Sequence, residues 1–384
     1  MPCAFHGITH VSRRALLQGA GAAGLVALAS PAVARLFPDG DFSAQIMALF
    51  DKAGGEVLGK AVPFVLTGPD MPWQQKLFEV TTGQKVTFLL SGRWHVARPL
   101  DLWFEPGVVF HARVAGGALF NPMDNSGTMV ADRDGAVEIA RSAGEFASPA
   151  GDLWGPAEEY VKADGRVEGV AILWNIAPEN GLRRMLVEGD VGLAVADALQ
   201  RETFPPVTPE GWHNHHNFGE AGIFQLNEDE MCCQTHKNVA ILRRDVNLDL
   251  TDGLTLDWDW LVEELPSLAA EDQVPTHDYL SIAVEYDDGQ DITFMWSAEL
   301  PQGTVFRCPL PGWNMIETHV VQRSGHADMG QWLSESRDLA KDYREIINGP
   351  ATKVLRVWLI ATSVFQRRTG LCRYRNLSIG GNAL

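Results

Sequence analysis

The stretch Leu254-Thr255-Leu256-Asp257-Trp258-Asp259-Trp260 alternates apolar and polar residues. Side chains two residues apart in a strand point to the same face of a sheet, so the stretch predicts a β-strand with one apolar and one polar face. Similar short runs rich in Val, Ile, Phe and Thr recur along the chain, separated by Gly, Pro, Asn and Asp. This pattern predicts an all-β protein of two tandem β-sandwich (jelly-roll-like) domains.

The domain boundaries follow from changes in this pattern. Before the first β run, apolar residues recur at helical spacing and predict a short N-terminal helix. A proline-rich stretch around Phe204-Pro205-Pro206 indicates a linker. The expected parts are a signal at 1–34, the helix at 35–60, a first sandwich at 61–180, a linker at 181–210, and a second sandwich at 211–384 as the candidate catalytic domain.

The first 34 residues predict a twin-arginine export signal. Ser12-Arg13-Arg14 precedes an apolar stretch that is too short to span a bilayer, and Pro31-Ala32-Val33-Ala34 offers small residues for cleavage before Arg35. We therefore expect a periplasmic or secreted protein that meets the twin-arginine translocase during export and has no stable membrane insertion.

The charge balance narrows the ligand class. The chain has 49 acidic and 31 basic residues, a formal net charge of −18. Such a charge repels nucleic acid and anionic lipid surfaces, so neither is an expected partner. An uncharged or cationic ligand is favoured over a polyanion instead.

Four cysteines lie outside the predicted signal: Cys232, Cys233, Cys308 and Cys372. In an oxidising compartment one or two disulfides are expected. The vicinal pair would be strained if bonded to each other, so we expect one of them to pair with Cys308 or Cys372. The cysteines lack zinc-ligand spacing, and no metal site is expected on these thiols.

Residues 71–176 resemble galactose-binding domains similar to the PA-I type galactophilic lectin, a small β-sandwich that binds sugar through calcium. The motifs that carry the resemblance are Pro72-Trp73, Val80-Thr81-Thr82-Gly83-Gln84-Lys85-Val86-Thr87-Phe88 and Ala131-Asp132-Arg133-Asp134-Gly135. Where the family has an Asn-Asp pair near its calcium ion, this chain has Arg141-Ser142, and a cation there disfavours calcium. No metal ligand is therefore carried over from the family. The cofactor is unknown, with Ca²⁺ or another divalent metal as the candidates, and Asp152 is the residue to inspect for an ion.

Residues 211–380 are similar to a family of bacterial exported β-sandwich domains of unknown function. The matching features are Trp258-Asp259-Trp260, Trp296, and the run 337–344 before Gly349-Pro350. The chain departs from the family at His277-Asp278, where the family has paired aspartates. The resemblance implies a jelly-roll-like sandwich and supplies no reaction.

Two pairs of side chains are candidates for acid–base catalysis. Asp257 and Asp259 share one face of their strand, about 7 Å apart, within the separations used by glycoside hydrolases. Glu317 and His319 share a face of another strand, and a histidine beside a carboxylate serves either proton transfer or metal ligation. For Asp257 and Asp259, the pattern favours the alternative that they form the solvated face of an amphipathic strand. His277 and Asp278, just before a strand, are further candidates.

Other residues are candidates for binding substrate or metal. Sugars stack on tryptophan while charged groups bind their hydroxyls. The substrate-binding candidates are Arg323, Arg356, Trp358 and Trp296. The weak metal-ligand candidates are His213, His215 and His216, together with Asp152.

These features favour an exported carbohydrate-active protein: a lectin-like module, followed by a sandwich that acts on a glycoside or polysaccharide by acid–base chemistry as a hydrolase or lyase. One alternative is a non-enzymatic glycan-binding or envelope scaffold protein. A second alternative is a metal-dependent periplasmic enzyme built on the His213, His215 and His216 cluster.

Overall fold

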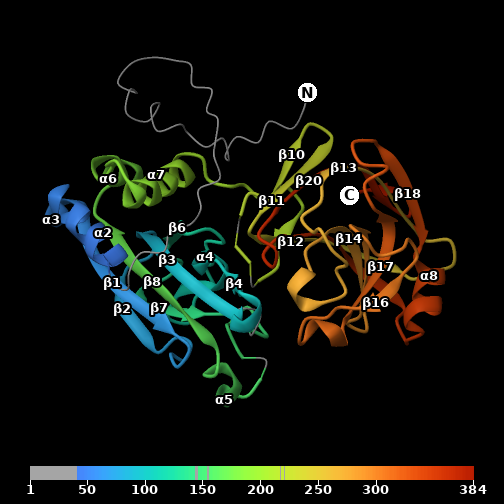
Figure 1. The fold of residues 1–384 in the computed structure, drawn as a ribbon, viewed down its shortest axis with the longest axis horizontal. Helices are drawn as coiled ribbons and strands as arrows, with labels where there is room; N and C mark the ends of the chain where they lie inside the picture. The colour runs from blue at the N-terminus through green and yellow to red at the C-terminus, as the bar shows by residue number, and fades with distance from the viewer. Residues whose placement is uncertain (1–40, 143–145, 154, 217, 220) are drawn as a thin grey trace.

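A computed structural model describes residues 41–142, 146–153, 155–216, 218–219 and 221–384. The predicted export signal, residues 1–34, lies outside the described residues. The chain folds into two β-sandwiches that lie side by side (Figure 1). The expected all-β class is confirmed, because sheets form both layers of each sandwich.

The first sandwich packs a five-stranded sheet on a three-stranded one. The larger sheet has the order β1 (Gly59–Thr67), β8 (Asp164–Trp174), β3 (Lys85–Ala97), β4 (Leu102–Phe104), with β6 (Ser126–Val130) also paired to β3. The smaller sheet has the order β2 (Gln75–Val80), β7 (Gly135–Arg141), β5 (Phe110–Val114). The shorter helical elements here are α3 (Gly55–Leu58), η1 (Arg98–Leu100), α4 (Pro106–Val109) and α5 (Ala157–Tyr160).

Three helices cover the outer face of the larger sheet: α2 (Asp41–Lys52), α6 (Pro178–Arg184) and α7 (Asp190–Thr203) (Figure 1). The residues expected to form a linker thus contain α7, whose Val195 and Leu199 pack against Trp174 of β8 in one buried cluster. The apolar stripe of α7 gives the physical reason, because a helix with such a stripe must bury it. Among the described residues, no helix is both long and apolar enough to cross a membrane.

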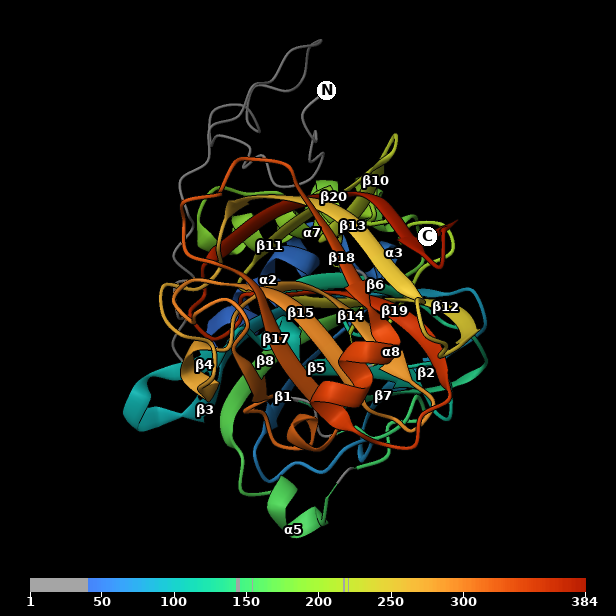
Figure 2. The ribbon, with the colours of Figure 1, turned by 90° about the vertical axis from the view of Figure 1, so that its right-hand side faces the viewer.

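The second sandwich packs a seven-stranded sheet on a six-stranded one. The seven-stranded sheet has the order β16 (Val305–Arg307), β17 (Glu317–Ser324), β15 (Asp291–Ser297), β14 (Leu280–Tyr286), β19 (Lys353–Thr362), β12 (Val239–Asp249), β9 (His213–Asn214). The other has the order β10 (Phe224–Asn227), β11 (Glu230–His236), β20 (Thr369–Ile379), β13 (Thr255–Glu264), β18 (Leu333–Asp338), with β21 (Asn382–Ala383) paired to β20. Figure 2 faces this sandwich and shows the two layers one above the other.

The core of the second sandwich is rich in tryptophan. Trp258, Trp260 and Trp296 are at most 1% exposed, and the rings of Trp260 and Trp296 lie 5.3 Å apart. Burying one large apolar side chain contributes about 1.5–3 kcal/mol, so these residues fix how the two sheets stack.

Residues 332–347 combine an edge strand with two short helical turns. Strand β18 comes first, followed by α8 (Leu339–Asp342) and the π-helical turn η4 (Tyr343–Ile347). β18 pairs with β13 at the edge of the sheet, and its Glu335 accepts a hydrogen bond from Trp260 Nε1. The short 3₁₀ turns η2 (Val274–Thr276) and η3 (Trp313–Met315) complete the domain.

The two sandwiches contact each other through ring and polar contacts. Phe104 and Phe365 pack edge to face with ring centroids 5.4 Å apart, and the Arg367 guanidinium lies 4.5 Å from the Trp103 ring. These residues of the second sandwich lie in the loop that joins β19 to β20. The same loop borders the site described next.

Candidate metal centre

The outer face of the seven-stranded sheet carries two rows of side chains that cross β19, β14, β15 and β17. One row pairs Trp358, Ala283, Thr293 and His319 in register. The neighbouring row pairs Arg356, Glu285, Asp291 and Glu317. Residues far apart in the sequence are thereby brought within a few strand spacings of one another, about 4.8 Å each.

Four donor residues converge at the β17 end of these rows. Glu317 and His319 come from β17, His277 precedes β14, and Cys308 follows β16. Each offers one ligand atom, and these four atoms lie within 4.8 Å of one another. Their exposed fractions are 0% for His277 and His319, 1% for Cys308 and 3% for Glu317. Among the described residues, this is the one such group of three or more His, Cys, Asp and Glu donors.

The His277 ring is oriented by the backbone. Its Nδ1 lies 2.6 Å from the carbonyl oxygen of Glu271, so Nδ1 carries the proton and donates it to that oxygen. The lone pair is then on Nε2, which lies 3.3 Å from Cys308 Sγ. Burial, together with the nearby His319, lowers the pKa of His277 to about 3, so the ring is neutral at pH 7. A neutral imidazole whose other nitrogen is held by a carbonyl is the usual state of a metal-ligating histidine.

His319 is buried without a hydrogen bond. Neither Nδ1 nor Nε2 has a hydrogen-bond partner, although Nε2 lies 3.4 Å from Glu317 Oε1. That separation is long for a hydrogen bond. It matches two ligands of one tetrahedral zinc ion, which lie about 3.3 Å apart when each is about 2.0–2.1 Å from the metal. Since buried polar atoms are nearly always partnered, the His319 ring lacks a partner that a metal ion would supply.

Glu317 supplies the negative charge of the group. Burial would raise its pKa, but the adjacent His319 outweighs that effect and lowers the pKa to about 2. Its Oε1 accepts hydrogen bonds from the Tyr279 and Thr293 hydroxyls, both at 3.1 Å. The pKa of neighbouring Asp291 is raised by burial and by Glu317, and that of Cys308 is raised for the same two reasons. The carboxylate charge thus stays on Glu317.

The donor set fits zinc. Two imidazole nitrogens, a cysteine sulfur and a carboxylate oxygen are all zinc ligands, and four protein ligands complete a tetrahedral site. Calcium and magnesium prefer all-oxygen sites, which this group does not provide. The hydroxyls on Glu317 and the carbonyl on His277 orient the ligands, as outer contacts do in zinc proteins.

Three predicted catalytic candidates, Glu317, His319 and His277, are therefore brought together. Cys308 was missed as their neighbour, because thiols were judged by the short spacings of zinc-finger motifs. The available signal was a single cysteine nine residues before the Glu317-x-His319 pattern. Glu271 was also missed; burial raises its pKa to about 7, and its carboxylate accepts hydrogen bonds from the Ala298 amide and the Ser297 hydroxyl.

Asp278 lies next to the group but points elsewhere. Its carboxylate accepts hydrogen bonds from the backbone amides of Phe365 and Gln366, at 3.0 and 2.6 Å. Burial raises its pKa to about 6. Asp278 thus holds the turn whose Phe365 packs on the first sandwich.

Asp257 and Asp259 lie on the outer face of the other sheet, away from His319 and Cys308. Asp257 accepts a hydrogen bond from Thr255, and Asp259 accepts bonds from Ser334, Arg375 and Asn376. Partial burial would raise the pKa of Asp259, but these three donors lower it below its usual value. The two carboxylates are partnered on a polar sheet face.

Two predicted substrate-binding residues lie elsewhere than expected. Trp296 is in the core, 0% exposed, with Nε1 donating to the Gly325 carbonyl, so it offers no sugar platform. Arg323 follows a β-bulge in the pairing of β15 and β17, and its Nε donates to Glu335 of β18 at 2.6 Å. In a regular strand Arg323 would share a face with Glu317 and His319, because their positions in the sequence differ by even numbers. The bulge breaks this alternation.

Arg356 and Trp358 share the outer face of the seven-stranded sheet, as their spacing predicts. Both donate to Glu285, from Arg356 Nη1 at 2.7 Å and Trp358 Nε1 at 3.0 Å. Arg356 Nε also donates to Asp245 at 2.7 Å. The side chains become more exposed along this row, from 3% at Glu317 to 17% at Glu285, 31% at Arg356 and 65% at Asp245. One row therefore joins the buried group to solvent.

The three histidines of the candidate cluster differ in exposure and in their contacts. His213 is exposed in β9, whereas His215 is buried and stacks on His216 with ring centroids 4.2 Å apart. Burial, His216 and Arg243 lower the pKa of His215. These imidazoles do not join a three-donor group among the described residues, and neither does Asp152, which accepts a hydrogen bond from Ser148.

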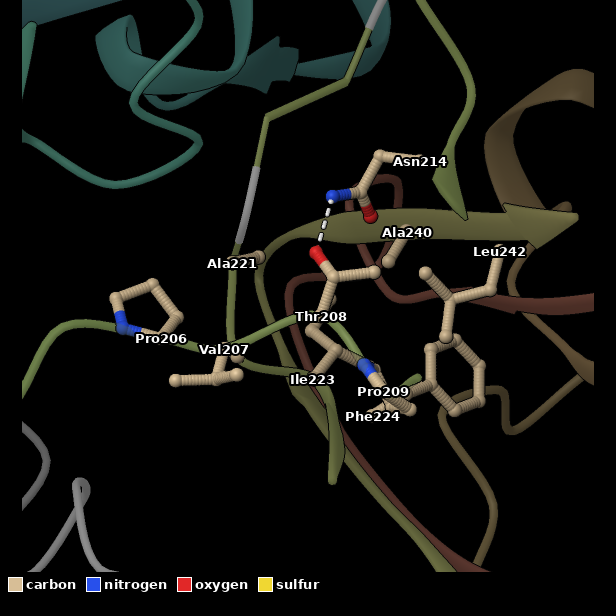
Figure 3. Close-up of a pocket in the computed structure, with 11 residues that line it drawn as sticks. Pro206, Val207, Thr208, Pro209, Asn214, Ala221, Ile223, Phe224, Ala240 and Leu242 are labelled. Atoms are coloured by element: carbon tan, nitrogen blue, oxygen red, sulfur yellow. Dashed lines mark hydrogen bonds between the residues drawn. The ribbon is translucent and has the colours of Figure 1, made fainter. Parts of the chain in front are cut away.

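A small pocket lies beneath the chain that enters the second sandwich (Figure 3). Its lining includes Pro206, Val207 and Phe224, and Asn214 donates a hydrogen bond to Thr208 at its edge. Its volume of about 10 Å³ is room for one water molecule at most. This pocket is therefore no ligand site.

Comparisons with known proteins find one family model that matches part of the chain and two distant structural likenesses. Residues 211–378 match a family model described as "Protein of unknown function (DUF3047)". No curated protein matches the chain significantly in sequence. One similar solved structure is the xyloglucanase domain of NopAA, a type three effector from Sinorhizobium fredii, in complex with cellobiose: 8% identity, 45% of this chain and 93% of that chain covered, TM-score 0.30.

A second similar structure comes from work on the promiscuous specificity of carbohydrate-binding modules of the β-sandwich superfamily. Its identity is 9%, it covers 83% of this chain and 97% of that chain, and its TM-score is 0.21. TM-scores this low carry no argument about activity, so the function is argued from the site.

Proposed function

We propose that the second sandwich is a zinc-binding domain whose ligands are His277, Cys308, Glu317 and His319. One observation carries the proposal: the four donor atoms lie within 4.8 Å of one another in the protein interior, and the His319 ring has no other polar partner there. A buried imidazole left in that state would destabilise the fold by roughly 1–3 kcal/mol. A zinc ion removes that penalty and neutralises Glu317.

The zinc ion has a structural role in this proposal. Catalytic zinc sites keep a position open for water or substrate, whereas a site with four protein ligands and no exposure is closed. The ligands come from three segments: β17, the residue after β16, and the loop before β14. Zinc would tie these segments together at the end of the sheet where β15 and β17 run parallel.

Elemental analysis of the chain, purified without a histidine tag, tests the site. We expect one zinc per chain, lost in His319→Ala and retained in His213→Ala, because His213 is an exposed histidine outside the group. Equal zinc in both variants, or none in the unaltered chain, would overturn the proposal. Circular dichroism of both variants separates loss of zinc from loss of fold.

A second proposal concerns carbohydrate, and the exposure gradient along the Glu317–Asp245 row favours it. Arg356 and Glu285 lie in fixed hydrogen bonds where the row opens to solvent, while Trp358, which also donates to Glu285, is buried at 5% exposure. Sugar hydroxyls bind such paired charged groups by hydrogen bonds. We propose that this end of the row binds a glycan, and that the first sandwich positions the same polymer in the manner of the galactose-binding domains it resembles.

Incubation with a panel of oligosaccharides, read by mass spectrometry and by binding, tests this second proposal. Weaker binding is expected for Arg356→Ala than for Arg344→Ala, an arginine whose ion pair with Asp252 lies outside the row. New product masses would identify a hydrolase or lyase, the finer form of the proposal, and binding alone would identify a scaffold. No binding to any member would contradict it.

Export through the twin-arginine route completes the proposal. That route carries folded cargo, and a zinc ion inserted before export would travel with the chain. Fractionation of cells expressing the full chain, compared with an Arg13→Lys, Arg14→Lys variant, tests it; retention of only the variant in the cytoplasm is the expected result.

A further inference from the structure

Two buried cysteines of the second sandwich face each other across a strand pair. Cys233 of β11 and Cys372 of β20 are directly opposite in antiparallel register, with exposed fractions of 0% and 1%. Both are thiols in the structure, and burial together with the adjacent Cys372 raises the pKa of Cys233. Opposite residues of an antiparallel pair have Cα atoms about 4.5–5.5 Å apart, within the range that a disulfide spans.

We propose that Cys233 and Cys372 form a disulfide that joins β11 to β20 when the chain meets a thiol-oxidising disulfide donor. The two thiols lose two protons and two electrons as the sulfur–sulfur bond forms. The donor disulfide accepts both electrons and is released as two thiols. This bond is independent of the zinc site, which lies on the other sheet.

The competing pairings are unfavourable. Cys308 Sγ lies 3.3 Å from His277 Nε2, in the donor group of the seven-stranded sheet. Cys232 is adjacent to Cys233, so its side chain points to the opposite face of β11. Of the pairings left open by the sequence, the fold thus favours the one between Cys233 and Cys372.

The position of Cys233 and Cys372 in the sheet indicates what the disulfide would stabilise. β10 is the edge strand of its sheet, and β11 lies between β10 and β20. A bond from β11 to β20 would fasten the β10–β11 hairpin to the middle of the sheet, so that the hairpin cannot separate from it. Burial raises the pKa of Cys233, and since the thiolate is the reactive form, the folded chain should oxidise slowly and the refolding chain quickly.

Peptide mapping of the full chain, refolded with oxidised glutathione, tests the proposal. Trypsin places Cys372 in residues 369–373, Cys308 in 308–323 and Cys233 in 202–237. In a Cys3→Ser, Cys232→Ser chain we expect 202–237 linked to 369–373, with Cys308 free for alkylation. The linked chain should unfold at a higher temperature than its reduced form.

The matched control adds Cys233→Ser, which should abolish the link. A bond to Cys308, or no bond after refolding, would overturn the proposal. Should the substituted chains fail to fold, the unaltered chain still decides: fragmentation of the linked peptides must place the bond on Cys233 and Cys372, and the linkage must persist when the native protein is treated with mild reductant.

Discussion

Two strands of the second sandwich, β17 and β13, share an alternating pattern of polar residues, but the polar face of β17 is buried and that of β13 is partly exposed. Each places two polar residues on the outer face of its sheet: Glu317 and His319 on β17, Asp257 and Asp259 on β13. On β17 the loops before β14 and after β16 cover the face and add His277 and Cys308. On β13 the carboxylates meet hydroxyl, amide and guanidinium donors at a partly exposed surface. The covering loops, which alternation cannot reveal, decide whether a polar strand face becomes a site.

The largest expected effect separates the two faces directly. Glu317→Gln in the zinc-loaded chain removes a buried charged ligand, so we expect the free energy of unfolding to fall by about 3–5 kcal/mol. Asp257→Asn makes the same isosteric change to a partly exposed carboxylate. It should alter the free energy of unfolding by no more than about 0.5 kcal/mol. Urea denaturation of both variants measures the difference, and equal effects would remove the distinction between the faces.

A smaller loss of stability is expected at Asp278, the residue that follows the proposed ligand His277. Asp278→Ala leaves the amides of Phe365 and Gln366 without an acceptor and should destabilise the chain by about 1–3 kcal/mol. Because Asp278 points away from the donor group, the variant should keep its zinc, whereas His277→Ala should lose it. Zinc content measured beside the unfolding curve checks this, and zinc loss in Asp278→Ala would place that residue in the site.

The smallest expected effect is a pH dependence on the β13 face. Ser334, Arg375 and Asn376 lower the pKa of Asp259, although partial burial opposes them. A depressed pKa in the folded state means that the contribution to stability is complete above the ordinary value of 3.8 and is lost as the pH falls below it. Asp259→Asn should remove this loss of stability below pH 3.8, an effect of about 1 kcal/mol or less. An unchanged profile would show that these hydrogen bonds contribute nothing measurable.

Much of the fold was predictable because alternation and helical spacing are local. The β-sandwich class and the shared faces of Glu317 with His319 and of Arg356 with Trp358 followed from single strands. Arg323 was misplaced by a bulge, which adds a residue that periodicity does not reveal. Trp296 was misread because one tryptophan in a strand fits a core and a binding face equally well.

The composition of the site was beyond local reasoning. His277, Cys308 and Glu317 come from separate segments, and sequence spacing carries no information about how loops fold over a sheet. The parallel pairing of β15 with β17, which aligns Asp291 with Glu317, depends on a connection of 19 residues from Ala298 to Ile316 and not on a hairpin. Tertiary contacts alone place Cys308 beside His277.

X-ray absorption at the zinc edge of the purified chain tests the central claim most directly. The account predicts one sulfur at about 2.3 Å and three nitrogen or oxygen ligands at about 2.0–2.1 Å. Cys308→Ser should remove the sulfur signal, while Cys372→Ser should leave it unchanged. A zinc environment without sulfur, or one unaltered by Cys308→Ser, would contradict the proposed centre.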